Sequence, residues 1–502
     1  MKIFNYILLA ILLVFTSCDD YLNEPPSKSD SIDPQTTADL EFLLNSYSSN
    51  QSEKNKDFIN CSDDYGLIKD IYDDNNAVYN ITPAQYATWD VEYLPVTEDR
   101  GYFSSEWPKV FSANFILHKL PDVSGTEAEK AALKQEAHFL RAYSYVNMVN
   151  TYCLPYAAEN MDEMGLPIKN STSFDVSYER ASLQATWDFI IADLEEALKL
   201  DRELELVSAG YRSWRASTAS VNAFAARVYL IMGNYAKAQS HAQKALDEHD
   251  ELVDYNTEMS YDPITEDYTD EDGNTYTVQY PITRAGQGAT DLRMEWKELY
   301  YFRFMENDWW WYIPSQELLD AYDQTNDLRY KYHMVEHYSF NRGLTKFDYP
   351  GYMFFFDAIP SGPTVAEMLL VKAECQARLG QWNDGITTAN RLRVVRMDNT
   401  ADPSVINLSA TDQDDAIAKI LEERRRELPY TQRFSDVRRF NYNNYPADDV
   451  VITREFYPVS SVIESSQPVT THVLDKKSRK YARPLPQQDI NLTLGAMKQN
   501  TY

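Results

Sequence analysis

The chain is short of cysteine and of positive charge. Its 502 residues include 4 cysteines, and 47 Lys and Arg stand against 77 Asp and Glu, which leaves a formal net charge of −30. This negative excess repels nucleic acid and anionic membrane surfaces, so we exclude both as partners. No two cysteines are spaced as CxxC, and the sequence therefore supports neither a zinc knuckle nor a redox dithiol. An apolar content of 44% with 25% charged residues is typical of a folded globular protein.

The apolar run at the N-terminus is too short to cross a bilayer. It covers Ile7 to Phe15 and follows the basic Lys2, the arrangement of a signal-peptide core. A small residue, Ser17, then directly precedes Cys18, which resembles a bacterial lipobox. We expect a signal peptide over residues 1–17, cleavage before Cys18 and a thioether-linked lipid on Cys18. An ordinary secreted protein with an incidental cysteine is the alternative.

The acidic segment that follows, rich in Pro and Ser, is predicted to be a flexible tether over residues 18–35. Three further cysteines lie beyond it, and an odd set outside the cytoplasm leaves one thiol free or paired elsewhere. Cys375 falls on the inner face of a predicted helix, so we expect a buried thiol there. The sequence leaves open whether Cys61 and Cys153 form a disulfide.

Residues 217–250 contain two helical patterns separated by a Gly-Asn break. Small residues recur at helical spacing on both sides of it, at Ala223, Ala226, Ala238, Ala242 and Ala245. Small inner faces allow two helices to approach closely and pack antiparallel. Gly233 is expected to adopt the left-handed conformation that ends the first helix. The pattern resembles a tetratricopeptide helix pair, which needs neighbouring elements to bury its apolar face.

The same pattern recurs without gaps in residues 364–396, where Gly380 corresponds to Gly233 and Ala389 to Ala242. We therefore predict a mainly α fold whose scaffold is an array of tetratricopeptide-like helix pairs with irregular loops. Further amphipathic patterns predict helices over residues 38–46, 106–120, 126–152, 182–200 and 314–323.

Residues 254–289 interrupt the helical pattern. An Asp-Gly-Asn turn between alternating residues predicts a small β-hairpin, on the outside or at the end of the array. Tyr268 and Gln279 occupy the first and twelfth positions of an EF-hand template, so the acidic residues favour a solvated hairpin over a calcium site. We expect one domain over residues 36–502, with an N-terminal half of about 36–250, this insertion at about 254–289 and a C-terminal half of about 290–502.

Two other motifs with charged residues favour a structural role over a metal-binding or catalytic one. His333 to His337 has the order His-x-x-Glu-His of an inverted zinc-peptidase motif, which requires a helix, whereas the alternation around Tyr332 is typical of a strand. Acidic and basic residues around Glu423 and Glu427 recur at helical spacing, which favours intrahelical ion pairs over an acid–base pair. We assign no metal, no cofactor and no catalytic residue.

Aromatic residues are dense in two stretches, the loop-rich acidic residues 61–90 and residues 291–312. Three consecutive Trp cannot all face one core, so at least one of residues 309–311 is expected at the surface. The apolar face of a sugar ring stacks on exposed aromatic planes; a bulky junction between surface and core is the alternative. The predicted ligand-binding residues are Tyr86, Trp89, Trp296, Trp309 and Trp310.

One stretch is more specific. Glu423-Arg424-Arg425-Arg426-Glu427-Leu428, followed by Arg433 to Phe440, resembles the ERRxEL…RxxDxxR signature of the SusD/RagB family. Similar pieces are FLRAYSYVNMVNTY around Arg141, AEMLLVKAECQARLG, and the ending ARPLPQQDINLTLGAMKQNTY. Thr431 stands where a Glu-Gly pair is usual, Leu485 replaces Ile, and the final Pro-Gly is missing. These departures affect the subfamily rather than the family.

The resemblance implies a non-catalytic lipoprotein of the outer membrane of Bacteroidetes, facing the cell exterior. In this family the helix pairs pack against a SusC-like TonB-dependent transporter, over which the protein acts as a hinged lid. It captures an oligosaccharide, or in some members a peptide, and passes it inward for glycan uptake. Ligand contacts come from variable loops, so no ligand residue is carried over from the family. Two alternatives remain open: a secreted glycoside hydrolase, and a tetratricopeptide-type interaction scaffold in which Trp89 and Trp309 are buried or silent.

Overall fold

The computed structural model describes residues 33–53, 56–97, 103–173, 177–207, 210–285, 290–306 and 311–502. The predicted helix pair is present as α12 (Thr218–Ile231) and α13 (Tyr235–Glu248). Ser217 caps α12 by accepting a hydrogen bond from the backbone N–H of Ser220, and Gly233 ends it with a φ of +70°. The alanines on both inner faces are fully buried, which allows the close approach that the spacing predicted.

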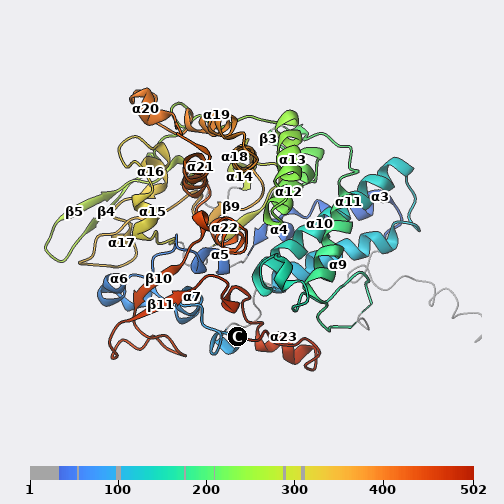
Figure 1. The fold of residues 1–502 in the computed structure, drawn as a ribbon, viewed down its shortest axis with the longest axis horizontal. Coiled ribbons are helices and arrows are strands. Elements are labelled where there is room, and N and C mark those ends of the chain that lie inside the picture. Colours follow the sequence, from blue (N-terminus) through green and yellow to red (C-terminus); the bar gives the residue numbers. More distant parts are fainter. Residues whose placement is uncertain are drawn as a thin grey trace, which may run out of the picture.

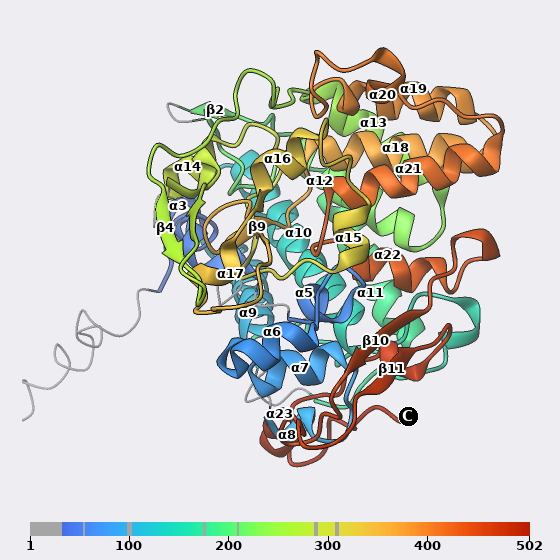
Figure 2. The same ribbon diagram turned by 90° about the vertical axis from the view of Figure 1, so that its left-hand side faces the viewer.

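The second pair is also confirmed, as α18 (Val365–Arg378) and α19 (Trp382–Arg393), with Gly380 at a φ of +85°. Gly385 in α19 sits against the carbonyl oxygen of Ala373, where a Cβ atom would approach to 2.7 Å. Helix α18 packs on α13, and α21 (Gln413–Glu427) covers α18 and α19. Figure 2 shows these helices as one stacked layer. The predicted array of helix pairs is therefore the scaffold of the fold.

The other large helices lie beside this layer (Figure 1). Helix α10 (Glu127–Tyr152) packs between α9 (Phe103–Lys119) and α11 (Leu183–Ala197), and α3 (Thr37–Leu44) lies against its first half. A capping box at Thr126 starts α10. The largest apolar core joins α9, α10 and α11 to α12, α13 and α18, so it draws on both expected halves of the chain.

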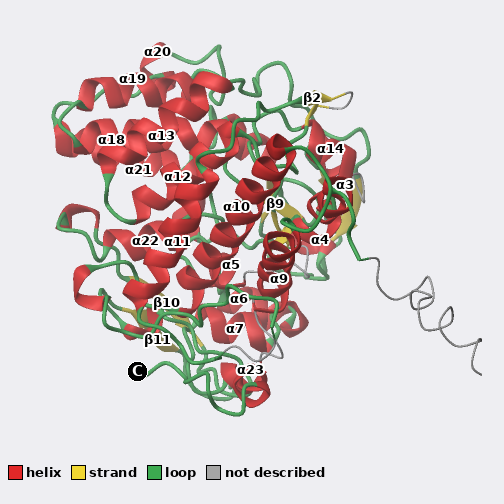
Figure 3. Ribbon diagram, turned by 90° about the vertical axis from the view of Figure 1, so that its right-hand side faces the viewer, coloured by secondary structure: helices red, strands yellow, loops and turns green. Residues whose placement is uncertain are grey.

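Strands are short and scattered, and helices dominate the fold (Figure 3). The predicted hairpin is present as β4 (Glu266–Thr269) and β5 (Thr275–Val278), antiparallel, at the edge of the molecule (Figure 1). A second hairpin joins β10 (Ile452–Phe456) to β11 (Thr470–Leu474). The one three-stranded sheet within the described ranges has the order β1 (Ser52–Glu53), β6 (Phe304–Glu306), β9 (Ala358–Pro360).

Two local predictions are wrong. Residues 61–90 are not mainly loop, because α6 (Lys69–Asp74) and α7 (Ile81–Ala87) form there on tertiary contacts. Residues 328–333 form a helix, α16 (Leu328–His333), before the two-residue strand β7 (Met334–Val335). The remaining elements are α4 (Tyr47–Asn50), α5 (Lys56–Cys61), α8 (Leu94–Thr97), α14 (Thr290–Glu295), α15 (Gln316–Asp320), α17 (Tyr338–Asn341), α20 (Pro403–Ile406), α22 (Arg433–Phe440), α23 (Gln487–Leu492), β2 (Leu206–Val207), β3 (Gly210–Tyr211) and β8 (Gly351–Tyr352).

The charged residues of α21 pair mainly with other elements, rather than within the helix. Glu423 is buried and receives Arg393 at 2.5 Å and Arg329 at 2.8 Å from elsewhere in the chain, in addition to Arg426 of its own helix at 2.8 Å. Glu427 likewise pairs with Arg329 and Arg396, both outside α21. The prediction of structural pairing is confirmed, but its intrahelical form is only part of the network.

The cysteines in the described residues are all buried thiols, so Cys61 and Cys153 form no disulfide. Cys61 donates a hydrogen bond to the carbonyl oxygen of Tyr86, and burial raises the pKa of Cys153 and Cys375. The predicted signal peptide and Cys18 lie outside the described residues. Within those residues, no helix combines the length and apolar character needed to span a membrane.

Candidate functional site

Two segments far apart in the sequence are joined side by side at the candidate site. The backbone N–H of Gly66 donates to the carbonyl oxygen of Ile313 at 2.8 Å, and that of Ser315 donates to Asp64 at 2.8 Å. Gly66 is required at this junction, because a Cβ atom would lie 2.6 Å from the carbonyl oxygen of Pro314. The pairing brings the two aromatic stretches of the sequence to one place.

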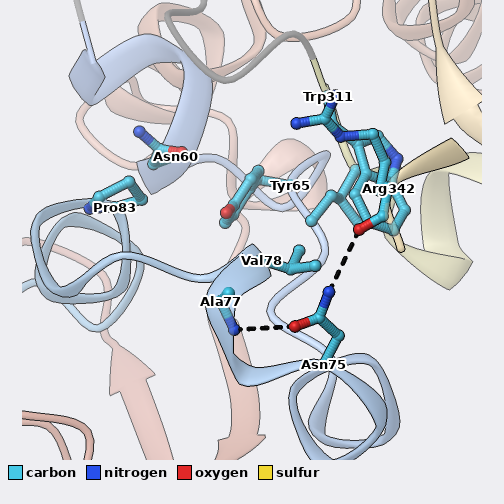
Figure 4. A pocket seen from close by; sticks show the side chains of 9 residues that line it. Asn60, Tyr65, Asn75, Ala77, Val78, Pro83, Trp311 and Arg342 are labelled. Atoms are coloured by element: carbon cyan, nitrogen blue, oxygen red, sulfur yellow. Dashed lines mark hydrogen bonds between the residues drawn. The ribbon is translucent and has the colours of Figure 1, made fainter. Parts of the chain in front are cut away.

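A cavity of about 110 Å³ opens at this junction. It is lined by two aromatic rings, two amides, one guanidinium group and small apolar side chains: Asn60, Tyr65, Asn75, Ala77, Val78, Pro83, Trp311, Ile313 and Arg342. Figure 4 shows these side chains around the hollow. Flat apolar rings beside hydrogen-bonding groups match the two kinds of surface that a sugar presents.

Tyr65 and Trp311 are held rigidly at the edges of the cavity, with only 6% and 4% of their surfaces exposed. The indole Nε1 of Trp311 donates to the carbonyl oxygen of Pro350 at 3.2 Å. Burial raises the pKa of Tyr65 against the opposing influence of Arg454, so its hydroxyl stays protonated and able to donate.

The turn that follows Arg342 is fixed by Asp74, the last residue of α6, and by Asn75 after it. Oδ2 of Asp74 accepts hydrogen bonds from the backbone N–H groups of Thr345, Lys346 and Phe347 at 2.8–3.0 Å. Burial alone would raise the pKa of Asp74, but these donors lower it below the ordinary value. Asn75 donates from Nδ2 to the carbonyl oxygen of Arg342 at 3.2 Å (Figure 4). The backbone at Arg342 is thereby held from the N-terminal half of the chain.

The predicted ligand residues of the first aromatic stretch are not exposed. Trp89 is 0% exposed, its Nε1 donates to the carbonyl oxygen of Cys61 at 3.1 Å, and its ring lies 5.1 Å from the guanidinium carbon of Arg454. Tyr86 is also buried, against Arg483. Both rings are buried in the core between α5 and α7 and line neither cavity at this junction, and their part in ligand binding stays a prediction.

In the second stretch, Trp296 is half-buried and belongs to another part of the molecule. Its ring packs at 4.9 Å from Phe354 and 6.4 Å from Tyr255, and it lines neither this cavity nor its neighbours. Trp309 and Trp310 lie outside the described residues. Trp311, which was not selected from the sequence, is the member of the triplet that lines the cavity.

Sequence reasoning missed most of the cavity lining. Tyr65 belongs to the aromatic stretch of residues 61–90, but the local sequence does not distinguish it from Trp89. Asn60, Asn75 and Arg342 carry no sequence signal, because they come from three separate segments that only the folded chain brings to one cavity.

The two histidines of the His-x-x-Glu-His stretch take separate partners. His333 is buried between the hydroxyl of Tyr255 and the carbonyl oxygen of Met353, each at 2.9 Å, and burial lowers its pKa to about 3. His337 pairs with Asp348 at 2.7 Å instead. No cluster of three or more His, Cys, Asp or Glu suited to a metal occurs in the described part of the chain.

Together these features define a class: a scaffold of tetratricopeptide-like helix pairs that carries a small aromatic cavity on irregular segments. Two family models match the chain, one described as "Starch-binding associating with outer membrane" over residues 20–230 and one as "SusD family" over residues 365–502. The chain belongs to the SusD/RagB family.

Individual relatives agree. SusD-like protein P38 of Formosa agariphila is 24% identical over 397 residues, which cover 70% of this chain and 71% of that protein. A SusD superfamily protein from Bacteroides vulgatus has the same fold, with a TM-score of 0.64 and 17% identity over 93% of this chain and 99% of the other. A solved "Laminarin binding SusD-like protein" gives a TM-score of 0.57 and 17% identity, with 93% of this chain and 99% of the other covered.

Proposed function

We propose that this chain is a cell-surface lipoprotein that binds an oligosaccharide in the cavity between Tyr65 and Trp311 and delivers it to an outer-membrane transporter. The single observation that carries the proposal is the lining of that cavity, where two rings stand beside amide and guanidinium donors. Rings stack on the apolar faces of sugars, and fixed polar groups select the hydroxyls. The starch-binding description of the matching family and the laminarin-binding relative support the same ligand class.

The proposed role is binding without catalysis. Hydrolysis of a glycosidic bond generally needs a pair of carboxyl groups that flank it. The residues that line this cavity in the described structure include no Asp or Glu. A glycan held there meets donors and rings, and it leaves chemically unchanged.

The partner we propose is a SusC-like TonB-dependent transporter, over which the chain acts as a lid, with a lipid on Cys18 as its anchor. The family description, which places its members at the outer membrane, supports this location. When the full-length precursor is expressed in cells, the Cys18→Ser variant should be lost from the membrane fraction. Protease added outside intact cells should degrade the wild-type protein. Retention of the variant in the membrane fraction would contradict the lipid anchor.

Binding is tested by titration calorimetry with a panel of oligosaccharides and peptides. The variant Arg342→Ala removes a half-buried donor from the cavity, and Arg391→Ala removes a surface arginine that pairs with Asp250. We expect Arg342→Ala to weaken glycan binding about tenfold, which is roughly 1.4 kcal/mol, and Arg391→Ala to leave it unchanged. Preference for peptides, or turnover of any glycan, would contradict the proposal.

A further inference from the structure

A second cavity, of about 280 Å³, shares Tyr65 with the first. Its walls come from the same two paired segments and from strand β10: Asp63, Tyr65, Gly66, Leu67, Ile68, Ser315, Gln316, Glu317, Val451, Ile452, Thr453, Arg454 and Glu455. The two cavities lie on either side of the same junction, with Ile313 in the wall of the first, Gly66 in the wall of the second and Tyr65 in both.

The charges on the open side of this cavity are negative. Glu317 and Glu455 are both exposed. Asp63 is neutralised by Arg433, whose Nη2 lies 2.7 Å from its Oδ2. The cation Arg454 is only 7% exposed and lies near the rings of Tyr65 and Trp89, on the inward face of β10.

The exposed lining offers hydrogen-bond acceptors for hydroxyl groups. Within the described residues, the carboxylate of Glu317 and the hydroxyl of Thr453 make no hydrogen bond, and both line the cavity. A carboxylate accepts hydroxyl hydrogen bonds on two oxygens. It repels a ligand carboxylate or sulfate at short range, and the net charge of −30 adds to that repulsion.

We propose that this cavity is a second sugar subsite, which selects neutral oligosaccharides longer than the first cavity holds and disfavours glycans that carry uronate or sulfate groups. The inference rests on the proposed function, since the cavity beside Trp311 supplies the first subsite.

The first test blocks the second cavity alone. Thr453 is an exposed position on β10, and Thr453→Trp fills the cavity without touching Trp311 or Arg342. Thr277→Trp makes the same change at an exposed position of β5, which lines neither cavity, and serves as the matched control. The probes are neutral gluco-, manno-, xylo- and galacto-oligosaccharides of two to six units, together with oligogalacturonates and sulfated galactans.

In the wild type, affinity should rise with length for a neutral series. Thr453→Trp should remove that rise, a loss of about tenfold for the longer members, and should leave the shortest member unchanged, while Thr277→Trp behaves as the wild type. Glu317→Lys should shift the ratio of affinities toward oligogalacturonates by about fivefold, and Glu195→Lys, on an exposed position of α11, should not.

The second subsite is overturned if Thr453→Trp matches Thr277→Trp at every length, or if the wild type prefers uronate or sulfated glycans. Neither result contradicts the proposed binding of glycans at the first cavity, which the Arg342→Ala variant tests separately. Absence of binding by every glycan to the folded wild type contradicts the proposed function itself, and this inference falls with it.

Discussion

Arg227 and Glu367 join the two helix pairs through a buried bidentate ion pair. Nε of Arg227 lies 2.9 Å from Oε1 of Glu367, and its Nη2 lies 2.5 Å from Oε2. Arg227 is on α12 and Glu367 is on α18, so the pair crosses from the first helix pair to the second. Such a pair is costly to break from one side, because the remaining charge stays buried without a partner.

We therefore expect Glu367→Gln to lower the free energy of unfolding by about 3–5 kcal/mol. The measurement is urea denaturation followed by circular dichroism. Glu195→Gln, an exposed glutamate on α11, is the control and should change stability by less than about 0.5 kcal/mol. Equal effects of the two substitutions would show that the pair does not hold the array together.

Acid should weaken the protein through Glu374. Burial would raise the pKa of this carboxyl, but Arg439 and Arg378 outweigh burial and lower it to about 2. Since the pKa is depressed by folding, the stabilisation is complete above about pH 4.5, the ordinary glutamate value, and is lost as the pH falls toward 2.

Between pH 6 and pH 3 this one group should remove about 2 kcal/mol from the free energy of unfolding. Glu374→Gln should be less stable at pH 6 and should lack that part of the pH dependence. Glu422→Gln, whose side chain is 55% exposed, should follow the wild-type curve. A Glu374→Gln curve parallel to that of the wild type would refute this assignment.

Gly385 should resist even the smallest substitution. Glycine to alanine within an exposed helix ordinarily stabilises by about 1 kcal/mol. Here the added methyl group would meet the carbonyl oxygen of Ala373 at 2.7 Å and push α19 from α18, so we expect a loss of about 2 kcal/mol. Thermal unfolding gives the sign directly, and a stabilised Gly385→Ala would contradict the close packing of this pair.

Trp89 should matter for stability and not for ligand binding. Trp89→Phe removes the hydrogen bond to Cys61 and part of a fully buried ring, so we expect about 2 kcal/mol of destabilisation. Glycan affinity, measured well below the melting temperature, should equal that of the wild type. A loss of glycan affinity without a loss of stability would show that Trp89 takes part in ligand binding.

The scaffold could be predicted from the sequence because its determinants are local. Alanines at helical spacing, Gly233 and Gly380 at the breaks, and the capping residues each act within one or two turns. The family signature around Glu423 was also local in sequence, although its charges pair mainly across the fold.

The cavity could not be predicted in the same way, because its determinants are remote contacts. Tyr65 and Trp89 lie in one stretch of similar composition and in one buried core, yet only Tyr65 also lines the cavity. The difference depends on Gly66 meeting Ile313, some 250 residues away in the chain. Aromatic density marks the two stretches that meet at the cavity, and only the pairing of these stretches identifies which rings line it.

The three backbone hydrogen bonds that Asp74 accepts have a consequence for the rate of ligand binding. They hold the turn after Arg342 in place in the unliganded protein. A ligand of the proposed site therefore meets a backbone turn that is already ordered, so its association requires no slow ordering of this turn. An ordered turn favours capture and release without a loop-folding step, which is what the proposed role of passing a ligand on requires.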